Sequence, residues 1–207
     1  MIPRGDFLRL ATLGALGTSN GLASPPASPV PSASPDPWDT CDDTGALPWD
    51  RPLGIKMRVL DGPDFDLTKY RGKAVMINVF ATWCGPCNAE MPHIVEAASD
   101  FAARGFEVIG IDDREPDDTV RAFRKKFDIA FPIAMDPNGF LVHSLEEGNQ
   151  RVSGALPYTF FIAPNGYLYC MRRGRMGRDE LRYRVTHFLD AIAAAASAPS
   201  PSPTPVR

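Results

Sequence analysis

The chain has 207 residues with a formal net charge of −3, and 44% of the residues are apolar. That length allows one domain with a substantial core and is short for two. The weak negative charge excludes a protein that binds nucleic acid or an anionic membrane surface through a basic charge. Four cysteines are an even number, which permits pairing in an oxidising compartment.

Residues 1–23 have the features of an export signal. A segment with two arginines, residues 4–10, precedes a weakly apolar stretch over residues 11–17, and small residues at Gly21 and Ala23 offer a cleavage site. The apolar stretch is too short to span a bilayer. We expect a protein of the periplasm or the extracytoplasmic face, either released or tethered to the inner membrane by a retained signal. The alternative is a disordered tail that is never cleaved.

Three further segments follow. Residues 24–46 are expected to form a linker and arm, because residues 24–37 are a Ser/Pro/Ala-rich stretch that cannot bury a core. We expect the folded domain over residues 47–196. Residues 197–207 are a Pro/Ser-rich tail that we expect to be disordered.

Within the folded segment, predicted strands alternate with predicted helices. The strands are expected over residues 55–60, 75–81, 106–111 and 131–136 and in a hairpin of 158–163 and 167–171. The helices are expected over residues 88–104, 119–127 and 179–196, with one or two helical turns in 140–147. The run 75–81 is nearly all apolar, as a parallel strand covered on both faces should be. The acidic stretch 112–118 is expected to be a loop that caps the second helix, with a metal site as the alternative.

The central motif is Trp83-Cys84-Gly85-Pro86-Cys87, between the apolar strand and the first helix. Two cysteines three positions apart at a helix start can close a small disulfide ring. The N–H groups and dipole of the helix N-terminus would stabilise a thiolate on Cys84. Pro86 is tolerated at an early helical position, which needs no N–H. Cys87, further into the first turn, is placed to resolve a mixed disulfide, so the motif predicts a redox dithiol.

Other uses of a CxxC pair fit less well. A zinc site would need a second CxxC or a Cys/His pair, whereas Cys41 and Cys170 are isolated and the three histidines have no ligand spacing. A c-type haem site would need a histidine directly after Cys87, and Asn88 stands there. We therefore expect no metal and no cofactor.

Four motifs along the chain occur together in an order that is typical of one protein family. They are Tyr70-Arg71-Gly72-Lys73, Trp83-Cys84-Gly85-Pro86-Cys87, Glu90-Met91-Pro92 and the stretch from Gly154 to Gly166 (GALPYTFFIAPNG). Over about residues 53–196 the sequence resembles the thioredoxin-like proteins of bacterial cell envelopes, the TlpA/ResA-like group. The resemblance implies an α/β thioredoxin fold with three layers and a mixed central sheet. Here the fold would carry an N-terminal arm and an αβ unit inserted over residues 112–136.

The resemblance also implies roles for two polar residues. Glu90 lies one helical turn after Cys87 and would tune the cysteine pair. The alternative is a surface glutamate that is favourable in the first turn of a helix. Asn78 stands where thioredoxins keep a buried carboxylate and cannot take up a proton, so it would only satisfy local hydrogen bonds.

A cis proline and a substrate surface are implied in the same way. Pro157 would be cis and lie against the dithiol, where its backbone offers an edge to an extended substrate segment. The alternative is a trans proline that opens a strand. Trp83, Gly85, Pro86 and Leu156 are the expected substrate contacts.

Two further groups of residues have open interpretations. Cys41 and Cys170 are expected to form a structural disulfide that pins the arm to the sheet, the alternatives being two buried free thiols or a second redox pair. The basic run of Arg172, Arg173, Arg175 and Arg178 is expected to be a solvated edge where the last helix begins, the alternative being a partner-docking patch.

The expected function is thiol–disulfide exchange through Cys84 and Cys87. The Gly-Pro pair between the cysteines is that of thioredoxins, which are reducing, so we expect a reductase, with a disulfide-donating oxidant as the alternative. The resemblance implies a membrane electron donor of the thiol-reductase type. It implies apocytochrome c or other envelope proteins as substrates, as in cytochrome c or oxidase maturation. We expect a monomer that binds no nucleic acid. A non-catalytic binding module is the rival class, and a peroxidase is weaker because the pattern Pro-x-x-x-Thr-x-x-Cys is absent.

Overall fold

The computed structural model describes Cys41 and residues 51–142 and 156–197. The predicted export signal, the linker apart from Cys41, and the tail beyond Ser197 lie outside the described residues. Residues Gly154 and Ala155 of the quoted motif also lie outside them.

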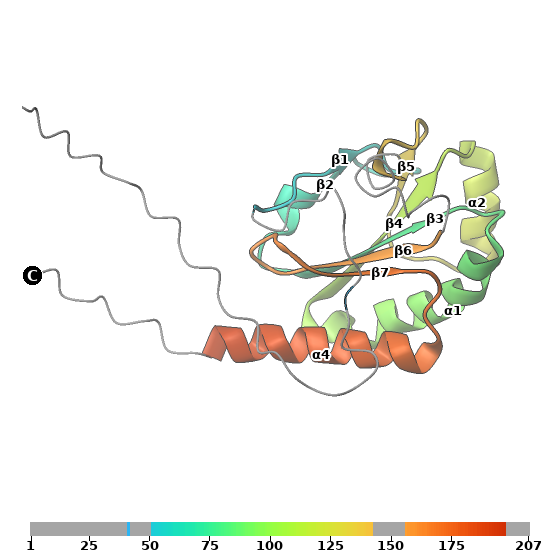
Figure 1. The fold of residues 1–207 in the computed structure, drawn as a ribbon. Helices are drawn as coiled ribbons and strands as arrows, with labels where there is room; N and C mark the ends of the chain where they lie inside the picture. The colour runs from blue at the N-terminus through green and yellow to red at the C-terminus, as the bar shows by residue number, and fades with distance from the viewer. Residues whose placement is uncertain (1–40, 42–50, 143–155, 198–207) are drawn as a thin grey trace, which may run out of the picture. The chain divides into compact units, whose positions relative to one another are not determined.

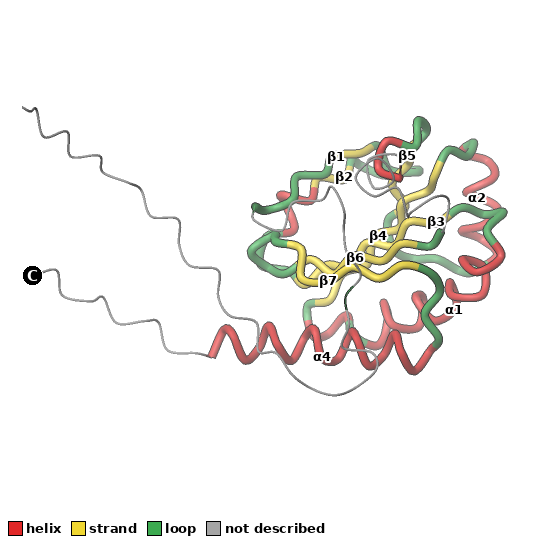
Figure 2. Tube along the Cα trace, in the orientation of Figure 1, coloured by secondary structure: helices red, strands yellow, loops and turns green. Residues whose placement is uncertain are grey.

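A five-stranded mixed sheet forms the centre of the described part, with the strand order β5-β4-β3-β6-β7 (Figure 2). The strands are β3 (Ala74–Phe80), β4 (Phe106–Asp113), β5 (Ile133–Asp136), β6 (Tyr158–Ile162) and β7 (Leu168–Arg173). Strands β3, β4 and β5 are parallel, β6 is antiparallel to β3, and β7 is antiparallel to β6. The predicted mixed central sheet is confirmed.

Helices cover the sheet. They are α1 (Gly85–Asp100), α2 (Asp117–Lys126) and α4 (Arg178–Ser197), with short 3-10 helices η1 (Leu67–Tyr70) and η2 (Ala102–Arg104). In Figure 1, α1 and α4 lie together beneath the sheet, whereas α2 lies above and to the right. This three-layer α/β arrangement confirms the predicted thioredoxin fold.

Aromatic side chains join the layers. Every residue of β3 is buried, as the apolar run predicts. Phe80 stacks on Phe123 of α2 with ring centroids 5.1 Å apart, and Phe161 of β6 meets Phe188 of α4 edge to face at 5.5 Å. The core therefore continues from β3 and β6 into the helices, and it fixes the end of β3 from which the dithiol motif follows.

The segment 55–60 is less regular than the sequence predicts. Only Lys56–Met57 form a strand, β1, which pairs with β2 (Phe65–Asp66). Val59 instead forms an isolated bridge with Ala134 of β5. The alternating pattern thus marks a short arm along the edge of the sheet rather than a full strand.

The acidic stretch 112–118 is predicted to be a loop that caps the second helix, and the structure differs in both respects. Asp112 and Asp113 are buried residues of β4, and the N-cap of α2 is Pro116, which offers no side-chain acceptor. Asp117 and Asp118 lie in the first turn, where carboxylates are favourable without a capping hydrogen bond. Of the helical turns predicted in 140–147, residues 140–142 are helical and the remainder lies outside the described residues.

Candidate active site

The dithiol lies where α1 follows β3. Cys84 and Cys87 are joined in a disulfide, and both are buried. Cys84 is the N-cap of α1, and its Sγ accepts a hydrogen bond from the backbone N–H of Cys87 at 3.2 Å. Helix α1 begins at Gly85, directly after Cys84, so the dithiol occupies the N-cap and the first turn, as the motif predicts. Once the disulfide is reduced, this N–H and the helix dipole favour a negative charge on Cys84 Sγ.

The segment that lies beside Cys84 from the other strand is Leu156-Pro157, and the peptide bond between these two residues is cis. The carbonyl oxygen of Leu156 lies 3.6 Å from Cys84 Sγ. Strand pairing brings this about, because Val79 near the end of β3 is in register with Tyr158 at the start of β6. The antiparallel pair thus brings together Cys84 and Leu156, 72 positions apart, at one end of the two inner strands.

The expected substrate contacts divide into side chains and backbone. Trp83 is 68% exposed, and Gly85 and Pro86 are also exposed. Leu156 is buried, and its carbonyl oxygen lies against Cys84 Sγ. The apolar surface open to a partner beside the disulfide is therefore that of Trp83 and Pro86.

Glu90 is fully buried, so the interpretation as a surface glutamate is wrong. Its Oε1 accepts the backbone N–H of Met176 at 3.0 Å. Burial raises the pKa of Glu90 to about 7, although the Met176 hydrogen bond and the nearby Asn78 amide act in the opposite direction. Asn78 donates from Nδ2 to Thr159 Oγ1 at 3.1 Å. A buried carboxyl one turn from Cys87 with a pKa near neutrality can hold or release a proton there.

A second acidic group braces the loop before Cys84, and sequence reasoning missed it. The backbone N–H and the hydroxyl of Thr82 both donate to the carboxylate of Glu115, with Oγ1 and Oε1 2.5 Å apart. Glu115 in turn donates its backbone N–H to Asp112 Oδ1 at 3.1 Å. Burial, together with Glu115, raises the pKa of Asp112. The only sequence signal was the acidity of the stretch 112–118, which indicated a cap rather than a brace.

Asn88 ties the same loop to the helix. Its Nδ2 donates to the carbonyl oxygens of Thr82 and Cys84 at 2.7 and 2.9 Å. Its Oδ1 accepts from Lys126 Nζ of α2 at 2.9 Å. Asn88 thus holds Thr82 and Cys84, Glu115 holds Thr82 a second time, and exposed Trp83 lies between them.

The remaining cysteines are bonded to each other, Cys41 Sγ to Cys170 Sγ, over a sequence separation of 129. Cys170 is buried in β7, at the edge of the sheet. The structure contains this expected bond, which joins Cys41 to the last strand of the sheet.

The basic run is largely occupied by ion pairs where α4 begins. Arg172 donates to Glu180 at 3.0 Å, and Arg178 pairs with Glu96 of α1. Both pairs attach α4 to its neighbours. They fit the expectation of a charged edge better than that of a continuous docking patch.

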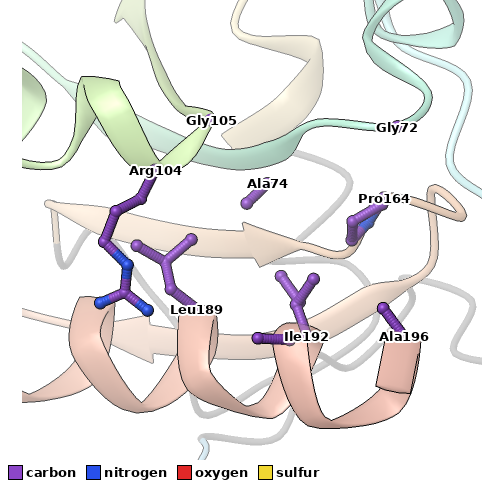
Figure 3. Close-up of a pocket in the computed structure, with 9 residues that line it drawn as sticks. Gly72, Ala74, Arg104, Gly105, Pro164, Leu189, Ile192 and Ala196 are labelled. Carbon is purple, nitrogen blue, oxygen red and sulfur yellow. The ribbon is translucent and has the colours of Figure 1, made fainter. Parts of the chain in front are cut away.

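Two surface hollows lie away from the dithiol. A cavity of about 310 Å³ separates α4 from the beginnings of β3 and β4 and is lined by Ala74, Arg104, Gly105, Pro164, Leu189 and Ile192 among others (Figure 3). A second, of about 540 Å³, is lined by Leu60, Phe65, Tyr70 and Pro132 among others. Neither lining includes Cys84, Cys87, Glu90 or Pro157.

The described part of the chain contains no group of three His, Cys, Asp or Glu side chains placed to bind a metal ion. None of its helices is both long and apolar enough to cross a bilayer.

Residues 53–170 match the family model described as AhpC/TSA family, which is more than half of the chain. The chain belongs to the AhpC/TSA family. A similar family member is the thiol-disulfide oxidoreductase ResA of Geobacillus thermodenitrificans, 33% identical over 123 residues, which are 59% of this chain and 67% of that protein.

Solved structures of thiol:disulfide oxidoreductases have a similar fold. A thioredoxin-family thiol:disulfide interchange protein from Chlorobium tepidum has a TM-score of 0.59 at 27% identity, covering 67% of this chain and 97% of that one. A Bacteroides thetaiotaomicron protein described as a disulfide isomerase has a TM-score of 0.60 at 26% identity, covering 70% and 89%. With the Cys84–Cys87 disulfide in place, the chain is a TlpA/ResA-like thiol-disulfide oxidoreductase, as the sequence predicts.

Proposed function

We propose that the chain reduces disulfide bonds of proteins outside the cytoplasm, with Cys84 as the attacking thiolate. The observation that carries the proposal is the position of Cys84 Sγ, which is at the N-terminus of α1 and 3.6 Å from the Leu156 carbonyl oxygen beside cis Pro157. The helix end stabilises the thiolate, and the cis segment offers backbone groups to an extended substrate.

The first step joins the protein to its substrate. In the reduced protein, the Cys84 thiolate attacks one sulfur of the substrate disulfide. A new S–S bond forms between Cys84 and that sulfur, the substrate S–S bond breaks, and the second substrate sulfur leaves as a thiolate that takes a proton. Exposed Trp83 and Pro86 provide the apolar surface against which the substrate packs.

The second step releases the substrate. Cys87 loses its proton and attacks Cys84 Sγ, so the mixed disulfide breaks and the first substrate sulfur leaves as a thiolate that also takes a proton. The substrate gains two electrons and two protons, and the protein ends with the Cys84–Cys87 disulfide. Glu90, buried one turn from Cys87 and with a pKa of about 7, is the group that accepts the Cys87 proton.

Several features support the reducing direction and the location. The Gly85-Pro86 pair is that of reducing thioredoxins. The likeness to ResA and to thiol:disulfide interchange proteins, with the export-like residues 1–23, supports an extracytoplasmic protein. We propose a membrane thiol reductase as electron donor and apocytochrome c or other envelope proteins as substrates. The segments in this proposal are the export signal, the arm, one domain over residues 47–196 and the tail.

Insulin reduction by dithiothreitol tests the activity. We expect wild type to accelerate insulin precipitation and Cys84→Ser to abolish the acceleration. The double variant Cys41→Ser/Cys170→Ser is the matched control, because it removes the other disulfide and should remain active. Equal rates for wild type and Cys84→Ser would exclude the proposed enzymatic activity and favour a non-catalytic binding module.

The reduction potential of the Cys84–Cys87 pair tests the direction. A value near roughly −270 mV would identify a reductant, and one near roughly −120 mV would identify a disulfide donor instead.

A further inference from the structure

The segment between β7 and α4 is attached to the active site at two points. Gly174 donates its backbone N–H to the carbonyl oxygen of Pro157 at 2.8 Å. Met176 donates its backbone N–H to Glu90 Oε1 at 3.0 Å, and its side chain is fully buried. Residue 175 lies between these two anchors, so its position relative to Pro157 and Glu90 is fixed by the backbone on both sides.

The residue held there is an exposed arginine. Arg175 is near enough for its charge to lower the pKa of Glu90. No hydrogen bond or ion pair occupies its guanidinium within the ranges 51–142 and 156–197, whereas Arg172 and Arg178 of the same run are bound to Glu180 and Glu96. Arg175 is thus a cation with unused hydrogen-bonding capacity, held beside the residues that an extended substrate would cross.

The charges around the site are arranged asymmetrically. The acidic pair Asp112 and Glu115 lies on the β4 side of β3, and Glu115 is already bound to Thr82. Arg175 lies on the opposite side, where β6 and β7 follow β3 in the sheet. Among the described residues, a substrate chain next to Pro157 therefore meets the positive charge of Arg175, whereas Asp112 and Glu115 lie on the other side of β3.

We propose that Arg175 is a specificity-determining residue that favours protein disulfides with acidic side chains next to the cysteine. The inference rests on the proposed reductase function and adds its substrate preference. The planar guanidinium pairs with a carboxylate through two parallel hydrogen bonds, and a charge at this position also speeds the encounter of opposite charges. For a partly exposed pair of this kind, the expected preference is about threefold to tenfold in rate.

The test uses the reduced full-length protein and three disulfide-bonded peptides. The peptides differ only in the residues that flank the cysteines, which are Asp, Asn or Lys. Second-order rate constants are measured for wild type, Arg175→Glu, Arg175→Gln and Arg51→Glu. The last variant is the matched control, because exposed Arg51 lies near Leu53, whose N–H bonds Gly166 at the turn between β6 and β7, at the sheet end remote from the dithiol.

Wild type and Arg51→Glu should reduce the Asp peptide about threefold to tenfold faster than the Lys peptide, and added salt should shrink the difference. Arg175→Gln should abolish the preference, and Arg175→Glu should reverse it. Equal rates of wild type with all three peptides, or an Asp preference that survives in both Arg175 variants, would overturn the inference. If wild type reacts with none of the peptides, the proposed function itself is wrong.

Discussion

The backbone N–H of Met176 donates a hydrogen bond to Glu90 Oε1 at 3.0 Å, although 86 positions separate the two residues. The bond fixes a buried carboxyl on α1 from the segment that leads into α4. The other carboxyl oxygen of Glu90, Oε2, is buried and accepts no hydrogen bond from the described residues. Glu90 therefore combines a fixed position with one oxygen available for a proton, which is the arrangement that a proton acceptor for Cys87 requires.

The first prediction concerns stability and pH in the oxidised protein. The pKa of Glu90 is about 7 in the folded protein and 4.5 by its ordinary value, so between these pH values the native state holds a proton that the unfolded chain releases. Stability from this group is complete below pH 4.5 and is lost as pH rises through 7. The free energy of unfolding of Glu90→Gln, minus that of wild type, should rise by roughly 3 kcal/mol between pH 4 and pH 8.

Glu96→Gln is the control for that measurement, made by urea unfolding at each pH. Glu96 is partly exposed, and its hydrogen bond with Arg178 holds its pKa below the ordinary value. Its contribution is present above pH 4.5 and is lost only as pH falls below that value, so the Glu96→Gln difference should stay nearly constant from pH 8 to about pH 5 and should not rise with pH. A Glu90→Gln difference that stays flat from pH 4 to pH 8 would contradict the raised pKa.

The second prediction concerns the resolving step. Without a carboxyl to accept the Cys87 proton, Glu90→Gln should break down the mixed disulfide about a hundredfold more slowly at pH 7. The attack of Cys84 should change much less. Rapid-quench experiments with a labelled disulfide peptide would show the mixed disulfide accumulating in the variant. A variant with a slow first step and no accumulation would assign Glu90 a different role.

The third prediction concerns the brace between Thr82 and Glu115. Thr82→Val removes the hydroxyl and keeps the backbone N–H, whereas Glu115→Ala removes the acceptor of both hydrogen bonds. Hydrogen bonds to a charged group are worth about 1.5–3 kcal/mol, so a double-mutant cycle should give a coupling of that order in the free energy of unfolding. Glu115→Ala should also lower the rate with insulin. Additive effects of the two substitutions would mean that the contact contributes nothing.

The dithiol and its neighbours could be predicted from the sequence because they are local. A strand, a CxxC motif and a helix follow one another directly, and the motif around Pro157 carries the family resemblance. The burial of Glu90 was not decidable, because a glutamate in a first helical turn also suits a surface. Only the docking of α4 and the Met176 contact distinguish the two.

The role of Glu115 was beyond sequence reasoning for a related reason. Two aspartates after an apolar run ordinarily mark the end of a strand, yet β4 continues through Asp113, which is in register with Asp136 of β5. That extension carries Glu115 to the level of Thr82. The register depends on the pairing of β4 with β5, which a single strand's composition does not specify.

The fourth prediction concerns the Cys41–Cys170 bond. It closes a loop of 129 positions, for which the chain-entropy model gives a stabilisation of about 5 kcal/mol as an upper value. Cys41→Ser/Cys170→Ser should lower the free energy of unfolding by up to that amount while insulin reduction persists. Differential scanning calorimetry of the oxidised proteins measures the loss. Unchanged unfolding temperatures would show that the bond does not constrain the unfolded chain.

The fifth prediction compares two glycines with the same left-handed backbone. Gly72 and Gly166 both have φ of +86°, but an added Cβ has open space at Gly72 and would overlap the guanidinium of Arg71 at Gly166. Arg71 donates to the carbonyl oxygen of Leu53 at 3.0 Å, which Gly166→Ala would disrupt. Both alanine variants should lose about 1–2 kcal/mol from the backbone, and Gly166→Ala about 1 kcal/mol more, by urea unfolding. Equal losses would mean that Arg71 moves aside without cost.

The antiparallel pairing of β3 with β6 also separates two events in folding, the oxidation of the dithiol and the completion of the substrate site. The CxxC segment is synthesised long before Pro157, so a partly made chain already has two thiols that small oxidants can close into a ring. It has no Leu156 carbonyl beside Cys84 until the middle of the sheet has formed. The Cys84–Cys87 disulfide can therefore form before the chain has folded. Recognition of a protein partner requires the folded sheet, so partner binding, and not the oxidation state of the cysteines, indicates a folded molecule.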